Sequence, residues 1–171
     1  MTKMTSAYAN KLLRQLSDDK DYWVNKENES CLYIAAVGEK PVIPEYDYEE
    51  IAATIADIDE KMAAIKHAIN LSNTTNQIQA GDQILTVDQI LIKTAQLNKR
   101  KVFLDRLRKQ LPKSRVTEFR YSSRLASPEY QYINYDLDLI KAEFERISNE
   151  IMVYQIALDK YNQTVEFDVE I

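Results

Sequence analysis

Apolar residues recur at alternating steps of three and four along residues 135 to 162, which is the most regular pattern in the chain. The positions are Leu137, Ile140, Phe144, Ile147, Ile151, Tyr154, Leu158 and Tyr161. This spacing places one apolar stripe along a helix that lies against other helices. The stretch has no Pro or Gly, and at about 1.5 Å per residue the helix would be roughly 40 Å long. The pattern predicts an elongated helical bundle.

A second stripe of the same kind follows Asp47, which can cap a helix together with Glu50 in an acidic form of the capping box. The stripe is formed by Ile51, Ile55, Ile58, Met62, Ile65 and Ile69. Helices with narrow apolar stripes hide most apolar surface by lying against each other or against a third helix. We therefore expect this helix to pair with the last one.

The first helix is predicted over residues 5 to 36, on a broad apolar pattern with a polar centre at residues 17 to 21. Gly38 should end it, and Pro41 and Pro44 should prevent it from resuming.

A third helix is predicted to start at a capping box formed by Thr86 and Gln89, and to run to about Leu111 before Pro112. Residues 70 to 85, which precede it, are rich in Asn, Ser, Thr and Gln and interrupt the helical pattern. We expect a long loop there.

Three segments change to a period of two, which is typical of strands. They are residues 116 to 121, 129 to 134 and 165 to 171. The last has an apolar face and a fully acidic one. We expect a small antiparallel sheet at one end of the bundle, although Ser127-Pro128-Glu129 also resembles a helix start. The fold class is thus mainly α, with about four long antiparallel helices, one β element and one domain over residues 1 to 171.

Composition agrees with long elements, because only 2 of the 171 residues are Gly and 4 are Pro. The one cysteine, Cys31, cannot form an intramolecular disulfide. No run reaches the roughly 18 apolar residues of a membrane span. A cytoplasmic location is the expectation.

Charge is unevenly distributed around the net value of -5. Residues 99 to 124 hold ten basic residues against two acidic ones, so this segment is +8 and the remainder is -13. One hypothesis is that the acidic face of residues 165 to 171 neutralises Arg115, Arg120 or Arg124. The alternative is a site for a polyanion, nucleic acid or a phosphorylated ligand that includes Arg115 and Arg120.

Several short motifs together resemble a group of uncharacterised bacterial proteins. They are Glu29-Ser30-Cys31-x-Tyr33-Ile34-Ala35-Ala36, Pro44-Glu45-Tyr46-Asp47-Tyr48, Ile65-Lys66-His67-Ala68-Ile69-Asn70, Leu111-Pro112-Lys113-Ser114-Arg115 and Thr164-Val165-Glu166-Phe167. Asn73-Thr74-Thr75 is a further motif of this group, and the turn Ile69-Asn70-x-x-Asn73-x-Thr75, followed by Gly81 and the helix start at Thr86, is similar to the septicolysin-like family. That resemblance implies a helical fold and a haemolysin-like label.

Candidate chemistry is sparse. His67 is the only histidine and Cys31 the only thiol, so one chain has no His-based metal cluster, and the ends of the two predicted helices keep this pair apart. A polar ligand pocket is one interpretation of Lys66, His67, Asn70, Asn73, Thr74 and Thr75; a loop that satisfies its own backbone is the other. Glycine-rich nucleotide motifs are absent, and we expect neither a cofactor nor a metal.

Three functions follow as hypotheses. The first is a non-enzymatic structural or interaction protein that self-associates or holds a protein partner, because the stripes and several tyrosines offer contact surface. The second is a polyanion binder acting through residues 99 to 124. The third, which rests on the family resemblance, is a membrane-active protein.

Overall fold

The computed structural model describes residues 1–116 and 129–171. In these ranges the chain forms four long helices and three antiparallel pairs of short strands, which confirms a mainly α fold with minor β structure. In chain order the elements are β1 (Thr2–Thr5), α1 (Ser6–Ser30), α2 (Tyr48–Thr75), β2 (Gln77–Ala80), β3 (Gln83–Thr86), α3 (Val87–Arg108), β4 (Lys113–Arg115), β5 (Tyr130–Tyr132), α4 (Leu137–Thr164) and β6 (Glu166–Val169).

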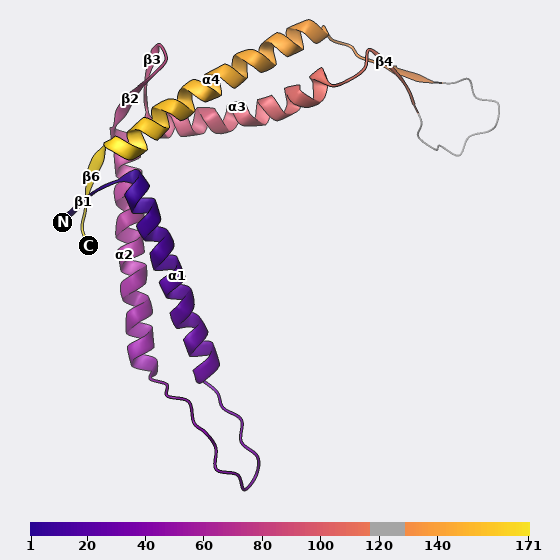
Figure 1. Ribbon diagram of the computed structural model, residues 1–171. Helices are drawn as coiled ribbons and strands as arrows, with labels where there is room; N and C mark the ends of the chain where they lie inside the picture. The colour runs from indigo at the N-terminus through magenta and orange to yellow at the C-terminus, as the bar shows by residue number, and fades with distance from the viewer. Residues whose placement is uncertain (117–128) are drawn as a thin grey trace, which may run out of the picture.

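The helices form two arms that diverge from one junction (Figure 1). Arm one is the antiparallel pair α1 and α2, and arm two is the antiparallel pair α3 and α4. Both chain termini lie at the junction. The predicted pairing of α2 with α4 is wrong, because each helix packs along its neighbour in sequence and α2 meets α4 only where the arms join.

Strands β1 and β6 bring the two ends of the chain together at the junction. Their antiparallel register places Met4 opposite Phe167 and Thr2 opposite Val169. Met4 and Val169 are both buried, and Val165 and Phe167 are partly buried, so the predicted apolar face points inward up to Val169, whereas Ile171 is exposed. The partner of this strand is a segment for which the sequence pattern predicted no strand.

The expected loop at residues 70 to 85 is instead the end of α2 followed by a β-hairpin. The hydroxyls of Thr74 and Thr75 donate to the carbonyls of Asn70 and Leu71, at 3.1 and 2.8 Å, so these side chains are accommodated within the helix. Strands β2 and β3 then pair through a two-residue turn that begins at Gly81, whose φ is +61°. A glycine at this place suits such a turn, because it accepts positive φ without strain.

The two predicted stripes are confirmed as buried seams, each within its own arm. In α2, Ile51, Ile58 and Ile65 are buried. In α4, the buried positions are Ile147, Ile151, Tyr154, Leu158 and Tyr161. The α4 seam packs against Leu104 in the outer part of arm two and against Val87 and Ile90 near the junction.

The predicted single sheet is wrong, because its segments lie at opposite ends of arm two. Strands β4 and β5 pair with each other beyond the far ends of α3 and α4, whereas β6 lies at the junction (Figure 1). Most of the expected strand at residues 116 to 121 lies outside the described residues. In the expected strand at residues 129 to 134, Tyr130–Tyr132 is extended and pairs with β4.

The predicted caps at two helix starts are confirmed, whereas the predicted end of the first helix is wrong. Thr86 and Gln89 form a complete capping box, with bonds of 3.2 and 3.1 Å. Asp47 accepts from the backbone N–H groups of Glu49 and Glu50. The first helix, however, ends at Ser30 rather than near residue 36. Since α2 begins only at Tyr48, residues beyond Ser30 have no facing helix on which to pack.

Candidate functional site

A groove of about 760 Å³ opens at the junction, between the last turns of α2 and strand β6. This volume lies in the range of small-molecule sites, which is roughly 300 to 1,000 Å³. We call it the junction groove. Its lining residues are Met1, Ala63, Ala64, His67, Ala68, Leu71, Ser72, Thr75, Asn76, Phe167, Asp168 and Glu170.

The groove forms because the residues on one side of α2 are small. Ala63, Ala64 and Ala68 have short side chains, so β6 and the helix leave space between them. Phe167 packs into the core beside Ile65 and Ala68 and forms an apolar part of the groove wall. Asp168 of β6 and Glu170, which follows the strand, are exposed and make the rim of the groove acidic. Such a groove favours an apolar or cationic group over an anion.

The predicted polar pocket is only partly brought together. His67 and Thr75 line the junction groove, whereas Lys66, Asn70, Asn73 and Thr74 lie on the last turns of α2 outside its lining. Arg115 is in β4, at the far end of arm two. Arg120 lies outside the described residues.

Sequence reasoning missed the residues that β6 contributes to the groove. The alternation of Val165, Phe167 and Val169 correctly indicates a strand, but it does not show where the strand lies. The position of β6 depends on its pairing with β1. Strand β1 (Thr2–Thr5) has too few residues to show an apolar period of its own, so the sequence pattern did not predict it.

A buried polar contact joins the two arms next to the groove. The hydroxyls of Ser72 in α2 and Tyr161 in α4 lie 2.6 Å apart, and both residues are buried. The Asn76 amide donates to the Ser72 hydroxyl at 2.9 Å. Because a buried hydroxyl without a partner is costly, this contact fixes how α2 meets α4.

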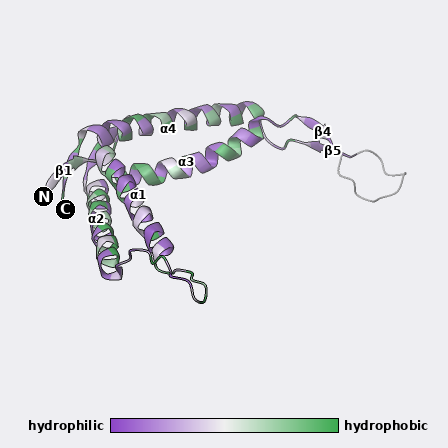
Figure 2. Cartoon of the chain, turned by 60° about the horizontal axis from the view of Figure 1, so that its bottom comes forward, coloured by the Kyte–Doolittle hydropathy of each residue, from purple (hydrophilic) through white to green (hydrophobic). Residues whose placement is uncertain are grey.

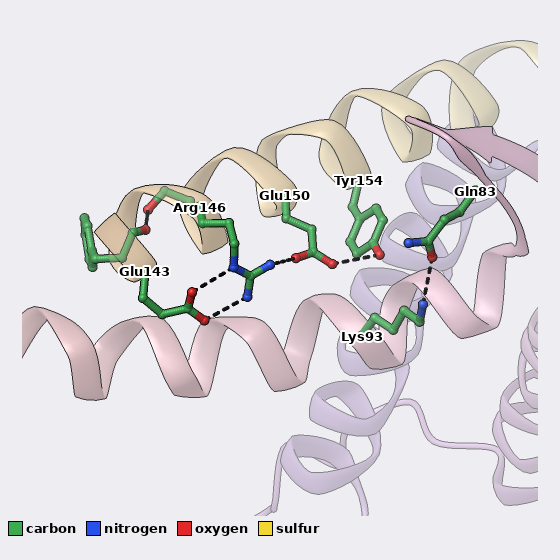
Figure 3. A network of polar contacts seen from close by, with 8 residues as sticks. Gln83, Lys93, Glu143, Arg146, Glu150 and Tyr154 are labelled. Atoms are coloured by element: carbon green, nitrogen blue, oxygen red, sulfur yellow. Dashed lines mark hydrogen bonds and ion pairs between the residues drawn. The ribbon is translucent and has the colours of Figure 1, made fainter. Parts of the chain in front are cut away.

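A chain of polar side chains runs along α4 toward the junction (Figure 3). Arg146 donates to both oxygens of Glu143, at 2.8 Å each, and to Glu150 at 2.9 Å. Tyr154 in turn donates to Glu150 at 3.1 Å. Hydrogen bonding to Arg146 lowers the pKa of Glu143. Burial, and then the hydrogen bond to Glu150, raise the pKa of Tyr154. The network therefore fixes the positions of these four side chains along α4.

The basic residues of α3 and β4 lie apart from the acidic C-terminal strand, so the predicted neutralisation of Arg115 by residues 165 to 171 is wrong. Arg120 and Arg124 lie outside the described residues. Strand β6 is at the junction, and the basic residues of α3 and β4 extend to the other end of arm two (Figure 1). Asp105 accepts from Arg108 and Lys109, which lower the pKa of its carboxyl. Between residues 99 and 115 there are eight basic residues and one acidic residue.

Aromatic rings hold several of these cations. The Arg108 guanidinium lies 4.1 Å from the centre of the Phe144 ring, and Lys113 lies 4.2 Å from that of Tyr130. Arg100 and Arg106 both lie over Phe103, at 5.3 and 5.1 Å. Cation–π contacts fix the position of a charge without cancelling it. Arm two thus carries a positive surface with exposed aromatic groups.

The far end of arm one has the opposite charge. Residues 45 to 60 contain seven acidic residues and no basic residue, and all seven side chains are exposed. They are Glu45, Asp47, Glu49, Glu50, Asp57, Asp59 and Glu60. Lys20 of α1 pairs with Asp59 at 2.7 Å, and Lys61 pairs with Asp57. Most of the negative charge at this end has no cation within the arm.

The two candidate reactive side chains, Cys31 and His67, lie far apart in the described ranges. Cys31 is exposed beyond the far end of α1, and His67 lies near the junction end of α2. His67 is 19 residues from the start of α2 at Tyr48, which corresponds to roughly 28 Å of helix. The described residues include no group of three or more side chains suited to hold a metal ion. None of their helices is long and apolar enough to cross a membrane.

Comparison with known proteins supports the fold and leaves the function open. The chain matches no protein-family model and no curated protein sequence. Its structure is similar to the crystal structure of a functionally unknown conserved protein from Corynebacterium diphtheriae, with a TM-score of 0.67 and 16% sequence identity. The match covers 98% of this chain and 100% of that one. The two-armed fold is therefore shared over its whole length with a conserved bacterial protein.

Proposed function

We propose that this protein is a non-enzymatic structural or interaction protein that works as a self-associated assembly. The observation that carries the proposal is its surface area. The chain exposes 13293 Å², whereas a compact monomer of 19.9 kDa exposes about 8,700 Å². Residues 117 to 128 can account for at most about 1,900 Å² of the exposed area, which is the area of an unfolded segment of that length. This excess is surface that contact with another chain would cover.

The layered architecture gives the physical reason for the excess. Each arm is one helix pair thick, so each helix buries one stripe against its partner and leaves its other side open. Apolar residues occur along the whole length of both arms (Figure 2). Large exposed examples are Tyr8, Tyr22, Tyr48 and Leu71 in arm one, and Val102, Leu139, Met152 and Ile156 in arm two. Contact with a second copy would remove such groups from water.

Light scattering coupled to size-exclusion chromatography tests this function on the full chain. We expect a mass of at least two chains at micromolar concentration. A mass of one chain, maintained up to the highest soluble concentration, would refute self-association. The shape must be determined separately by small-angle scattering, because an elongated monomer also elutes early.

A second candidate function is polyanion binding through residues 99 to 124, and the separation of the basic segment from the acidic strand favours it. A fluorescent single-stranded oligonucleotide is a suitable probe. Binding should weaken steeply as salt rises, because the phosphates release condensed counterions when lysine and arginine neutralise them. Binding that is insensitive to salt, or no binding at low salt, would exclude this mode.

The third and least favoured candidate is membrane activity, which the similarity to septicolysin-like proteins implies. Dye release from liposomes that contain anionic lipid is the direct test. We expect no release, because the charged faces of both arms leave only narrow apolar stripes.

A further inference from the structure

The two arms carry surfaces that are complementary in both charge and size. On α2, Glu49, Ala53, Ala56 and Glu60 share one side of the helix, and all four are exposed. On α3, Lys99, Val102, Phe103 and Arg106 share one side, and all four are exposed as well. The spacings of three, four and seven residues put each set within about 100° around its helix. We call these the acidic stripe and the basic stripe.

From this complementarity we propose that the acidic stripe of one copy docks on the basic stripe of a second copy. This inference rests on the self-association proposed above and names its surfaces. The alanines leave a shallow face between two carboxylates, and Val102 and Phe103 form a raised apolar face between two cations. Side chains of unlike size pack closely between helices, and unlike charges at the edge set the register.

The charge balance of the two regions supports the same pairing. Residues 18 to 60, which form the outer part of arm one, contain 13 acidic and 3 basic residues and are net -10. Residues 99 to 115 are net +7, from eight basic residues and Asp105. At low ionic strength, fields of this sign and size steer two copies toward contact between unlike arms. They also oppose contact between like arms.

Within one chain the stripes do not meet, because the arms diverge from the junction and their outer parts lie apart (Figure 1). A contact between unlike arms uses both stripes of each subunit, either reciprocally in a ring of two copies or with two different neighbours. A standard contact buries about 800 Å² on each partner, and two such contacts fit within the excess surface. The assembly is then a closed ring or an open chain of subunits.

Charge reversal tests the docking on the full chain. One variant combines Glu49→Lys with Glu60→Lys, and the other combines Lys99→Glu with Arg106→Glu. In either variant alone both stripes have the same sign, and we expect the dissociation constant of the assembly to rise at least about 100-fold, because like charges across an interface cost several kcal/mol. Mixing the two variants restores unlike pairs, so assembly should return at equal molar ratio.

Matched controls separate this inference from the proposed function. A variant with Lys11→Glu and Lys160→Glu makes the same change of net charge as the basic-stripe variant, at two exposed positions outside the stripes, and should assemble like the parent chain. Circular dichroism checks that every variant keeps its helices. A monomeric parent chain would contradict self-association itself. An oligomeric parent whose stripe variants assemble as well as the control, or whose mixed variants stay monomeric, would overturn only the stripe docking.

Discussion

Arm one and arm two are both antiparallel helix pairs, yet they are held together in different ways. In arm two, α4 buries two tyrosines as well as isoleucines along its length, and Leu104 of α3 is fully buried against Ile147 and Ile151. In arm one, the only buried residues of α1 are Ser6 and Ala9, in its first turns. The outer half of α1 contacts α2 through partly exposed side chains and the ion pair between Lys20 and Asp59.

The same motif, an antiparallel helix pair, is therefore stabilised by different contacts in the two arms. Arm two has a buried cluster in its outer part, whereas Ile51 and Ile58 of arm one are buried outside any cluster. The buried cluster of arm one lies at the junction, where Met4, Ala9, Ile65 and Val169 pack together. An exposed ion pair contributes little to stability, so the outer part of arm one should open more readily than arm two. Contact with a neighbouring subunit would then stabilise arm one more than arm two.

The largest expected effect comes from emptying the core of arm two. Leu104→Ala should lower the free energy of unfolding by about 3 kcal/mol, because Leu104 is 0% exposed and its loss leaves a cavity against Ile147 and Ile151. Urea unfolding followed by circular dichroism measures the loss. Ile58→Ala in arm one, at 7% exposure and outside the buried clusters, should cost less.

Leu91→Ala is the matched control for this comparison, because Leu91 lies in the same helix and is 44% exposed. Its effect should stay below about 1 kcal/mol. Equal losses for Leu104→Ala and Ile58→Ala would show that the two arms have equally strong cores, which would contradict the contrast drawn between them.

A smaller effect is expected where the arms meet. Tyr161→Phe removes the hydroxyl that lies 2.6 Å from Ser72 and should cost about 1 to 2 kcal/mol, because a buried polar group is left without this partner. Ser72→Ala should cost a similar amount. In the double variant the losses should not add, since both changes remove one contact. Additive losses in urea unfolding would show that the contact does not couple the arms.

Much of the helical structure was predictable because regular apolar spacing and capping residues act locally. The stripe of α4 and the capping box at Thr86 were both confirmed on this basis. Partner choice was not predictable, since α2 and α4 have equivalent stripes and the spacing does not show which helix each one meets. Polar composition was also misleading at residues 70 to 85, where Thr74 and Thr75 form hydrogen bonds to the helix backbone and do not end it.

The candidate site was less predictable than the fold, because it depends on contacts between segments that are distant in sequence. His67 and Thr75 were identified from residue type alone, and both line the junction groove. Phe167 and Asp168 reach the same groove only through the pairing of β6 with β1, the element that the sequence pattern did not indicate. Likewise, the two stripes can be recognised as separate surfaces only when the directions of both arms are known, and a local sequence pattern does not give these directions.

The smallest expected effect concerns the ion pairs of Asp105 in arm two, and it should depend on pH. Hydrogen bonds from Lys109 and Arg108 lower the pKa of Asp105 in the folded chain. Its stabilising contribution is therefore present above the pKa of an aspartate in the unfolded chain and is lost as the pH falls through the lowered folded value. Asp105→Asn should reduce the urea midpoint slightly at neutral pH and by less at about pH 2. Asp159→Asn is the control, because Asp159 forms no ion pair within residues 1–116 and 129–171, and it should change the midpoint at neither pH. A loss that persists unchanged in acid would assign the effect of Asp105→Asn to packing and would show that the ion pairs of Asp105 do not stabilise arm two.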